Sequence, residues 1–129
     1  MREHELQFRV RYAETDAMGF VHHSHYFTYF EMGRTELLRA GGGNYREMEA
    51  QGCLMVVARL ACSFHAPARY DDVLTLQTRI SKVGAAKLEH EYKLSRDGLL
   101  LAEASSVLAC VDRQGTVQRI PDCFLQTAR

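Results

Sequence analysis

Residues Tyr12–Arg34 read YAETDAMGFVHHSHYFTYFEMGR and join a polar turn to an aromatic segment. Gly19 allows the backbone to change direction sharply, because glycine adopts positive φ without a steric penalty. The pattern after the turn predicts a helix from about Ser24 to Ala40, with Ser24 as its N-cap. Asp16 is therefore expected close to a helix start, whose free N–H groups and dipole favour negative charge. A carboxylate beside such an anion-stabilising pocket is what acyl transfer requires.

The predicted helix has one face suited to packing against a sheet. Tyr26, Phe30, Gly33 and Leu37 share that face through their i, i+4, i+7 and i+11 spacing. A glycine inside a helix costs about 1 kcal/mol relative to alanine, so we expect Gly33 to permit close approach of a sheet. The three glycines at 41–43 should end the helix, and residues 44–51 predict a short second one.

Outside the helices, alternation of apolar and polar residues predicts a series of strands. They cover residues 5–12, 53–64, 73–82, 87–94, 99–111 and 116–120. The pair Asp97-Gly98 is the strongest hairpin signal in the chain. One long helix before a run of antiparallel strands predicts a single α+β domain over residues 1–129, with a curved sheet wrapped around the helix.

Composition excludes several classes of protein. The chain of 129 residues carries 16 basic and 16 acidic side chains, so its net charge favours neither nucleic acid nor an anionic membrane as a partner. No apolar run is long enough to span a membrane, and the polar N-terminus does not resemble a signal peptide. Four widely spaced cysteines without a C-x-x-C pair indicate reduced thiols in a cytoplasmic protein rather than a zinc site.

Residues 11–26, RYAETDAMGFVHHSHY, resemble the signature of the 4-hydroxybenzoyl-CoA thioesterase family. The pattern is most similar to its acyl-CoA thioesterase branch, which includes the Tol-Pal-associated bacterial enzymes. Its positions are met by Asp16, Gly19, Val21, His23 and Tyr26. A second block, residues 64–76 with a proline and an Asp-Asp turn, also resembles the family, so the resemblance covers nearly the whole chain.

The resemblance implies a hotdog fold and hydrolysis of CoA thioesters, or sometimes of acyl carrier protein thioesters. It implies a homodimer or a dimer-of-dimers tetramer with active sites at subunit interfaces, and neither metal nor organic cofactor. The catalytic carboxylate corresponds to Asp16, and the amide that polarises the thioester carbonyl corresponds to about His23, whose side chain assists in some members. His22 and His25 depart from the residues common in the family and leave the substrate preference open.

The chemistry of Asp16 has two forms that the sequence leaves open. It activates a water molecule as general base, or it attacks the thioester and forms a mixed anhydride. A turn or capping role is the alternative for an aspartate in this position. The remaining substrate-binding candidates fall into two groups. The first, around the reacting group, comprises Gly19, Val21, His22, Ser24 and Tyr26, and the second, for CoA phosphates, comprises Arg59, Arg69, Lys82 and Lys87.

Other functions are less compatible with the same residues. The three histidines at 22, 23 and 25 lack the i, i+4 spacing of helical metal ligands. Ser24 has no G-x-S-x-G elbow around it, which disfavours a serine hydrolase. We expect Glu36 to form an ion pair on the protein surface. The turn at residues 81–87, a candidate for binding CoA phosphates, has a second interpretation as a solvent-exposed hairpin tip. The sequence thus predicts an acyl-CoA thioesterase, with an acyl carrier protein thioesterase or a non-catalytic acyl-CoA binder as alternatives.

Overall fold

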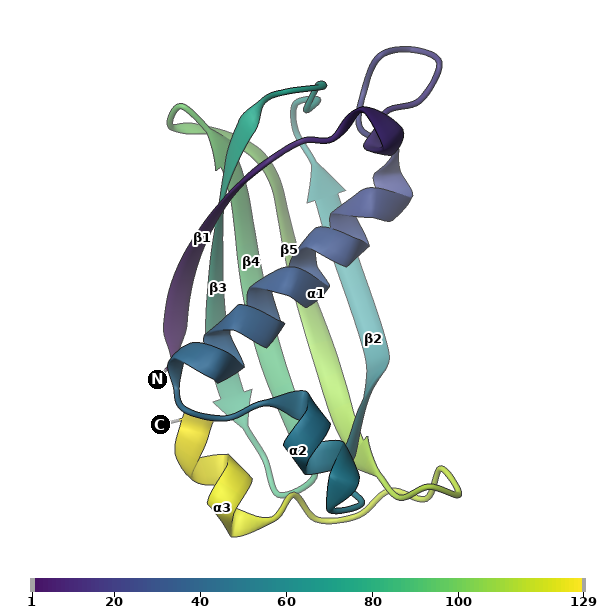
Figure 1. The fold of residues 1–129 in the computed structure, drawn as a ribbon, viewed down its shortest axis with the longest axis vertical. Helices are drawn as coiled ribbons and strands as arrows, with labels where there is room; N and C mark the ends of the chain where they lie inside the picture. Colours follow the sequence, from purple (N-terminus) through teal and green to yellow (C-terminus); the bar gives the residue numbers. More distant parts are fainter. Residues whose placement is uncertain (1, 129) are drawn as a thin grey trace.

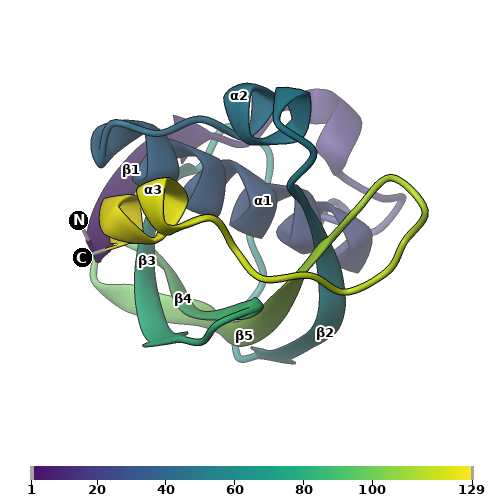
Figure 2. The same ribbon diagram turned by 90° about the horizontal axis from the view of Figure 1, so that it is seen from below.

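A five-stranded antiparallel sheet curves around one helix in the computed structural model of the protein, which describes residues 2–128. The strands are β1 (Glu3–Arg9), β2 (Leu54–Phe64), β3 (Val73–Val83), β4 (Lys87–Arg96) and β5 (Leu99–Val111). The helices are α1 (His23–Ala40), α2 (Tyr45–Ala50) and α3 (Asp122–Leu125), with 3-10 turns η1 (Tyr12–Glu14) and η2 (Gln126–Ala128). The order across the sheet is β1-β3-β4-β5-β2. Figures 1 and 2 show α1 lying across the inner face of the curved sheet.

The core lies between α1 and the sheet, as the helical periodicity predicted. Tyr26, Phe30 and Leu37 are buried on the face of α1 that packs against the sheet. The rings of Phe30 and Tyr92 stack with their centroids 4.7 Å apart. Alternation along β3 and β4 likewise puts one face in the core and one in solvent, which explains why these strands were predicted so closely.

Gly33 marks the closest approach of α1 to the sheet. A Cβ atom added there would lie 2.3 Å from Thr78 Oγ1 and 2.7 Å from Leu76 Cδ2. Both neighbours belong to β3, and both are buried. The close approach expected from a mid-helix glycine is therefore confirmed.

The secondary structure differs from the prediction mainly at three places. β1 ends at Arg9, and Tyr12 is 76% exposed, because the chain leaves the sheet and turns into η1. The strand expected over residues 116–120 was wrong, since only Val117 forms a bridge pair, with Val111. The N-cap of α1 is His22 rather than Ser24, because the His22 side chain accepts the hydrogen bond from the Ser24 N–H.

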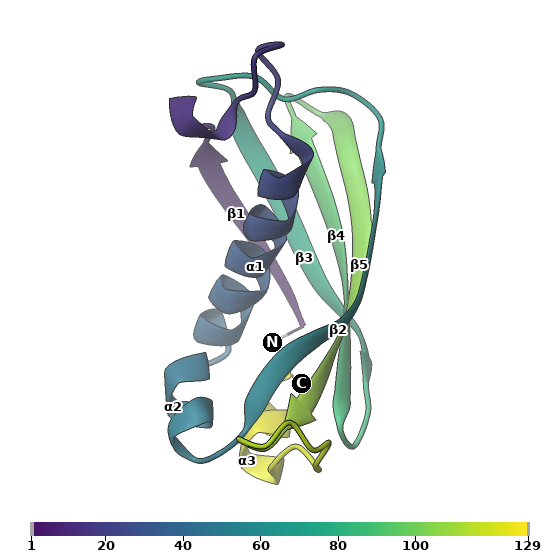
Figure 3. The same ribbon diagram turned by 90° about the vertical axis from the view of Figure 1, so that its right-hand side faces the viewer.

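The two ends of the domain carry different features (Figures 1 and 3). The loop from Val10 to His22 and the start of α1 lie at one end. The β3–β4 hairpin, α2 and α3 lie at the other end. A functional site around Asp16 is thus separated from the hairpin by the length of the sheet.

Three further features of the structure bear on predictions made from the sequence: a surface ion pair, the state of the cysteines and the hydropathy of the helices. Glu36 pairs with Arg39 on α1, as the charge spacing predicted. All four cysteines are free thiols, of which Cys53 and Cys110 are buried. Among residues 2–128, none of the helices has both the length and the hydropathy needed to cross a bilayer.

Candidate active site

The loop from Asp16 to Phe20 is closed by its own backbone and by one carboxylate oxygen. Asp16 N–H donates to Phe20 O at 2.8 Å, and Gly19 N–H donates to Asp16 O at 3.0 Å. Gly19 has a φ of +86°, the conformation that its sequence position predicted. Asp16 Oδ1 accepts hydrogen bonds from Met18 N–H (2.9 Å) and Phe20 N–H (3.2 Å). Within residues 2–128, Asp16 Oδ2 makes no hydrogen bond, so half of this carboxylate is available for chemistry.

The start of α1 is capped in a way that leaves one N–H group available. His22 N–H donates to Glu14 O at 3.0 Å, and His22 Nδ1 accepts from Ser24 N–H at 3.2 Å. His25 N–H donates to His22 O at 3.0 Å. The His23 N–H has no acceptor in the described part of the chain. It points from the positive end of the helix dipole and can polarise a carbonyl oxygen.

Asp16 and His23 line the same open cleft, which has a volume of about 360 Å³. Its lining residues are Asp16, Met18, Phe20, Val21, His23, Tyr26, Phe64, His65, Ala66 and Pro67. The cleft combines the Asp16 carboxylate, the start of α1 and the rings of His23 and His65 with apolar side chains such as Phe20 and Phe64. This combination suits a substrate that has a polar reacting group and an apolar acyl group.

Aromatic rings form the wall between α1 and the end of β2. The rings of Tyr26 and Phe64 meet edge to face with centroids 4.9 Å apart. Tyr26 is buried, and this burial raises its pKa, so its hydroxyl stays neutral. Phe64 is 48% exposed and offers a free apolar surface to the cleft. Tyr26 on α1 is therefore held in the core, whereas Phe64 on β2 presents an exposed ring to the cleft.

Glu14 anchors the loop and was missed by the sequence reasoning. It is 4% exposed, and its Oε1 accepts from Arg11 N–H at 2.8 Å and from the Tyr29 hydroxyl at 2.9 Å. Its Oε2 accepts from the Arg11 guanidinium at 3.0 and 3.1 Å. Burial opposes ionisation, but the bonds from Arg11 and Tyr29 outweigh it and lower the pKa of Glu14. Glu14 thereby ties the segment before Asp16 to the buried face of α1.

The Glu14→Gln variant should unfold more easily at neutral pH, by about 1–2 kcal/mol, because charge-assisted bonds to Arg11 are lost. The lowered pKa means that the unfolded wild-type chain takes up a proton that the folded chain does not, once the pH falls below the ordinary value of 4.5. Wild-type stability from this group is thus present above pH 4.5 and is lost as the pH falls through the lowered pKa. Urea unfolding from pH 7 to pH 3 should show a shallower loss in Glu14→Gln than in the wild type. The exposed Glu5→Gln variant is the control, and equal curves for both variants would contradict the anchoring role.

The predicted residues around the reacting group divide into two sets. Asp16, Val21, His23 and Tyr26 line the cleft. Gly19, His22 and Ser24 lie beside it without lining it. Gly19 shapes the loop, while the His22 ring and the Ser24 hydroxyl contact each other at 2.9 Å across the helix cap.

The cations expected to hold CoA phosphates are not gathered around the cleft of one chain. Arg69 is the nearest, because its backbone pairs with Phe20 and its guanidinium lies 5.0 Å from the Phe20 ring centroid. Arg59 is exposed on β2. Lys82 and Lys87 flank the β3–β4 hairpin at the opposite end of the sheet, and Lys82 is 3.9 Å from Glu89. Antiparallel topology explains this separation, because β3 runs away from the Asp16 loop.

Other cleft residues were not assigned to the site from the sequence. Met18, Phe20 and the segment 64–67 line it with the predicted residues. The resemblance of the block from Phe64 onward, with its proline, was the signal that could have found that wall. The three neighbouring histidines do not form a metal cluster: among the residues that the structure describes, no three His, Cys, Asp or Glu side chains are grouped as a metal site would require.

Known proteins resemble this chain over nearly its full length. Residues 10–127 match the Thioesterase-like superfamily. The acyl-CoA thioesterase YbgC of Haemophilus influenzae is 39% identical over 105 residues, which cover 81% of this chain and 77% of that protein. The crystal structure of a "Probable Thioesterase" from Bartonella henselae has 34% identity and a TM-score of 0.87, covering 92% of this chain and 99% of that one.

A more distant structure shows how widely this fold is shared. The 4-hydroxybenzoyl-CoA thioesterase from Pseudomonas sp. strain CBS-3 has a TM-score of 0.88 at 20% identity, covering 98% of this chain and 99% of that one. At this identity the likeness concerns the fold alone, which is the predicted hotdog fold with its five-stranded antiparallel sheet. The family match and the YbgC relative go further, and together they show that this chain belongs to the thioesterase-like superfamily.

Proposed function

We propose that the protein hydrolyses an acyl-CoA to a free acid and CoA, as a member of the YbgC-like branch. The observation that carries this proposal is the pairing of a free carboxylate oxygen on Asp16 with a free N–H on His23 in one cleft. The thioester carbonyl lies between them, and the acyl group lies along the apolar wall. The name of the Haemophilus relative, acyl-CoA thioesterase, agrees with this reading.

The reaction follows from the two groups. The carbonyl oxygen accepts a hydrogen bond from the His23 N–H, which stabilises the negative charge that develops on it. Asp16 Oδ2 removes a proton from water, the water oxygen bonds to the carbonyl carbon, and the C–S bond then breaks. The proton held by Asp16 passes to the departing sulfur, which leaves as the CoA thiol. In the alternative nucleophilic mechanism, Asp16 bonds to the carbonyl carbon, the C–S bond breaks and the CoA thiolate leaves and takes up a proton; water then hydrolyses the mixed anhydride to the free acid and Asp16.

Thiol release from a panel of acyl-CoAs, followed with a thiol-reactive dye, tests the proposal. The panel includes short, branched, medium straight and aromatic acyl groups, because the cleft is open and has both polar and apolar walls. Rapid release from at least one of them supports the proposal. Turnover of acyl carrier protein substrates alone would instead favour a carrier-protein thioesterase. Saturable binding without release would indicate a non-catalytic binder.

Assembly into a homodimer or a dimer of dimers is part of the same proposal. β2 is an edge strand and carries exposed apolar residues, including Val56, Val57 and Phe64. Such an edge is a template for pairing with a second copy. Phe64 also lines the cleft, so pairing there would add a second subunit beside the site. The free thiols agree with a cytoplasmic location for the assembled enzyme.

Placing a charge on this edge should separate the subunits. The Val57→Lys variant is expected to elute as a monomer and to lose most of its thioesterase activity, because the lysine opposes edge pairing. Light scattering and the thiol-release assay measure both effects on the same sample. Leu99→Lys, an exposed apolar position on β5, is the matched control. A fully active monomer would rule out a site completed by a second copy.

A further inference from the structure

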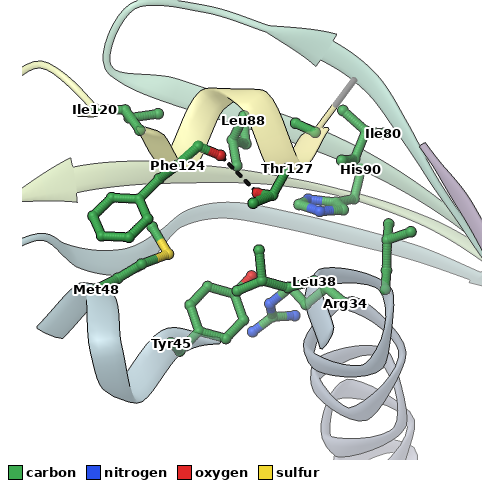
Figure 4. A pocket seen from close by; sticks show the side chains of 12 residues that line it. Arg34, Leu38, Tyr45, Met48, Ile80, Leu88, His90, Ile120, Phe124 and Thr127 are labelled. Carbon is green, nitrogen blue, oxygen red and sulfur yellow. Dashed lines mark hydrogen bonds between the residues drawn. The ribbon is translucent and has the colours of Figure 1, made fainter. Parts of the chain in front are cut away.

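A second, much smaller cavity lies at the other end of α1 from the Asp16 cleft (Figure 4). It is enclosed between α1, α2, the sheet and the C-terminal segment, and its volume is about 20 Å³. A space of this size holds one species about as large as a water molecule. Most of its walls are apolar, with Leu38, Met48 and Leu88 among them. The proposed thioesterase reaction makes no use of this cavity.

Two buried polar side chains enter this cavity from different elements. Arg34 on α1 is 9% exposed, and within residues 2–128 it forms neither a hydrogen bond nor an ion pair. His90 on β4 is 2% exposed, and its Nδ1 has no partner in the same part of the chain. Figure 4 shows the Arg34 guanidinium and the His90 ring extending into the same space. The cavity thus presents unused hydrogen-bonding groups on two sides.

Arg34 brings a positive charge to the cavity, and no acidic side chain among the described lining residues faces it. Burial and the nearby Arg34 charge lower the pKa of His90 to about 4, so the imidazole is neutral at pH 7 and Arg34 is the charged group. A buried cation is costly unless an opposite charge compensates it. The five donors of a guanidinium are suited to an anion, and neutral His90 adds one donor in its Nδ1–H tautomer.

We propose that this cavity binds one small monovalent anion of the size of chloride, held by the Arg34 guanidinium and the Nδ1–H of His90. The volume excludes phosphate, sulfate and carboxylate ligands, which are several times larger than one water molecule. The anion joins α1 to β4 beneath the C-terminal segment and stabilises the folded chain. The site is separate from the Asp16 cleft, so its existence does not depend on the proposed function.

Thermal unfolding in matched salts tests the site. The full chain is heated in sodium chloride, sodium bromide or sodium gluconate at equal ionic strength, since gluconate is too large to enter. At a halide concentration about 100 times its dissociation constant, the folding equilibrium constant should rise about 100-fold, which shows as a Tm several degrees higher. Arg34→Gln should lose this halide-specific rise. Arg46→Gln removes an exposed arginine from α2 and should keep it.

Crystals of the wild-type protein grown in bromide give a second test that does not depend on how the variants fold. The expected result is an anomalous bromine peak in the cavity, within hydrogen-bonding distance of the Arg34 guanidinium. NMR of the His90 ring should also show the Nδ1–H tautomer in bromide. Equal wild-type Tm values in halide and gluconate, or electron density for water without an anomalous signal, would overturn the proposal.

Discussion

The Asp16→Asn variant should hydrolyse acyl-CoA at least about 100-fold more slowly than the wild type, with kcat rather than substrate binding affected. The geometry of the loop explains why kcat should fall while substrate binding persists. Asp16 Oδ1 accepts from the Met18 and Phe20 N–H groups, and an asparagine amide oxygen can accept both bonds. The amide nitrogen then replaces Oδ2, the oxygen that has no hydrogen bond in the described chain. The loop therefore keeps its shape while the proposed base or nucleophile is removed.

Asp112→Asn is the matched control for this variant. Asp112 Oδ1 accepts from Gln114 N–H and Thr116 N–H, both at 2.9 Å, which is the same i+2 and i+4 pattern as at Asp16. The control thus makes the same chemical change in the same kind of turn, away from the cleft. Steady-state kinetics and isothermal calorimetry of acyl-CoA binding separate kcat from affinity. If the two variants had the same near-normal kcat, Asp16 would be a turn residue only.

The Gly33→Val variant should lower the free energy of unfolding by about 3 kcal/mol, mainly through overpacking between α1 and β3. A Cβ at this position would already lie within 3.0 Å of Thr78 Oγ1 and Leu76 Cδ2. Both side chains are buried in a packed layer and have little room to move. Gly33→Ala should show a smaller loss, because the gain in helix propensity of about 1 kcal/mol offsets part of the strain.

Urea unfolding of these variants, with Thr28→Val as control, measures the effect. Thr28 lies on the exposed face of α1, so the same valine there should change the free energy of unfolding by less than about 0.5 kcal/mol. If Gly33→Val were as stable as the control, α1 could not approach β3 as closely as the structure shows.

Strands with one wet and one buried face were predictable to within a few residues. β3 was expected over residues 73–82 and spans Val73–Val83, and β4 was expected over residues 87–94 and spans Lys87–Arg96. The false strand at 116–120 shows where alternation fails. Its apolar residues Val117 and Ile120 suggested a strand, but Asp112 binds two following N–H groups and holds the chain in a loop. Hydrogen bonds from the Asp112 side chain to the backbone thus took the place of the backbone pairing that a strand needs.

The parts of the candidate site that are local in sequence were also predictable. Asp16 and His23 are seven positions apart, and turn and helix-start chemistry brings them to one cleft. The opposite wall comes from Phe64 and its neighbours, a contact between distant segments that no periodicity could indicate. Glu14 was missed because its burial depends on the Tyr29 hydroxyl, fifteen residues later on the inner face of α1. The helix cap was misassigned because two adjacent side chains, His22 and Ser24, could both serve that role, and the ring nitrogen of His22 does.

The contrast between the anchored and open sides of the cleft has a consequence for protein engineering. The loop and Tyr26 are held by buried bonds and packing, whereas Met18 and Phe64 face outward. We expect substitutions at Met18, which is 73% exposed, to change acyl-chain selectivity with little effect on folding. Libraries that vary Met18 while leaving Glu14 and the β2 edge residue Phe64 unchanged are therefore the natural starting point for redirecting this scaffold to new thioesters.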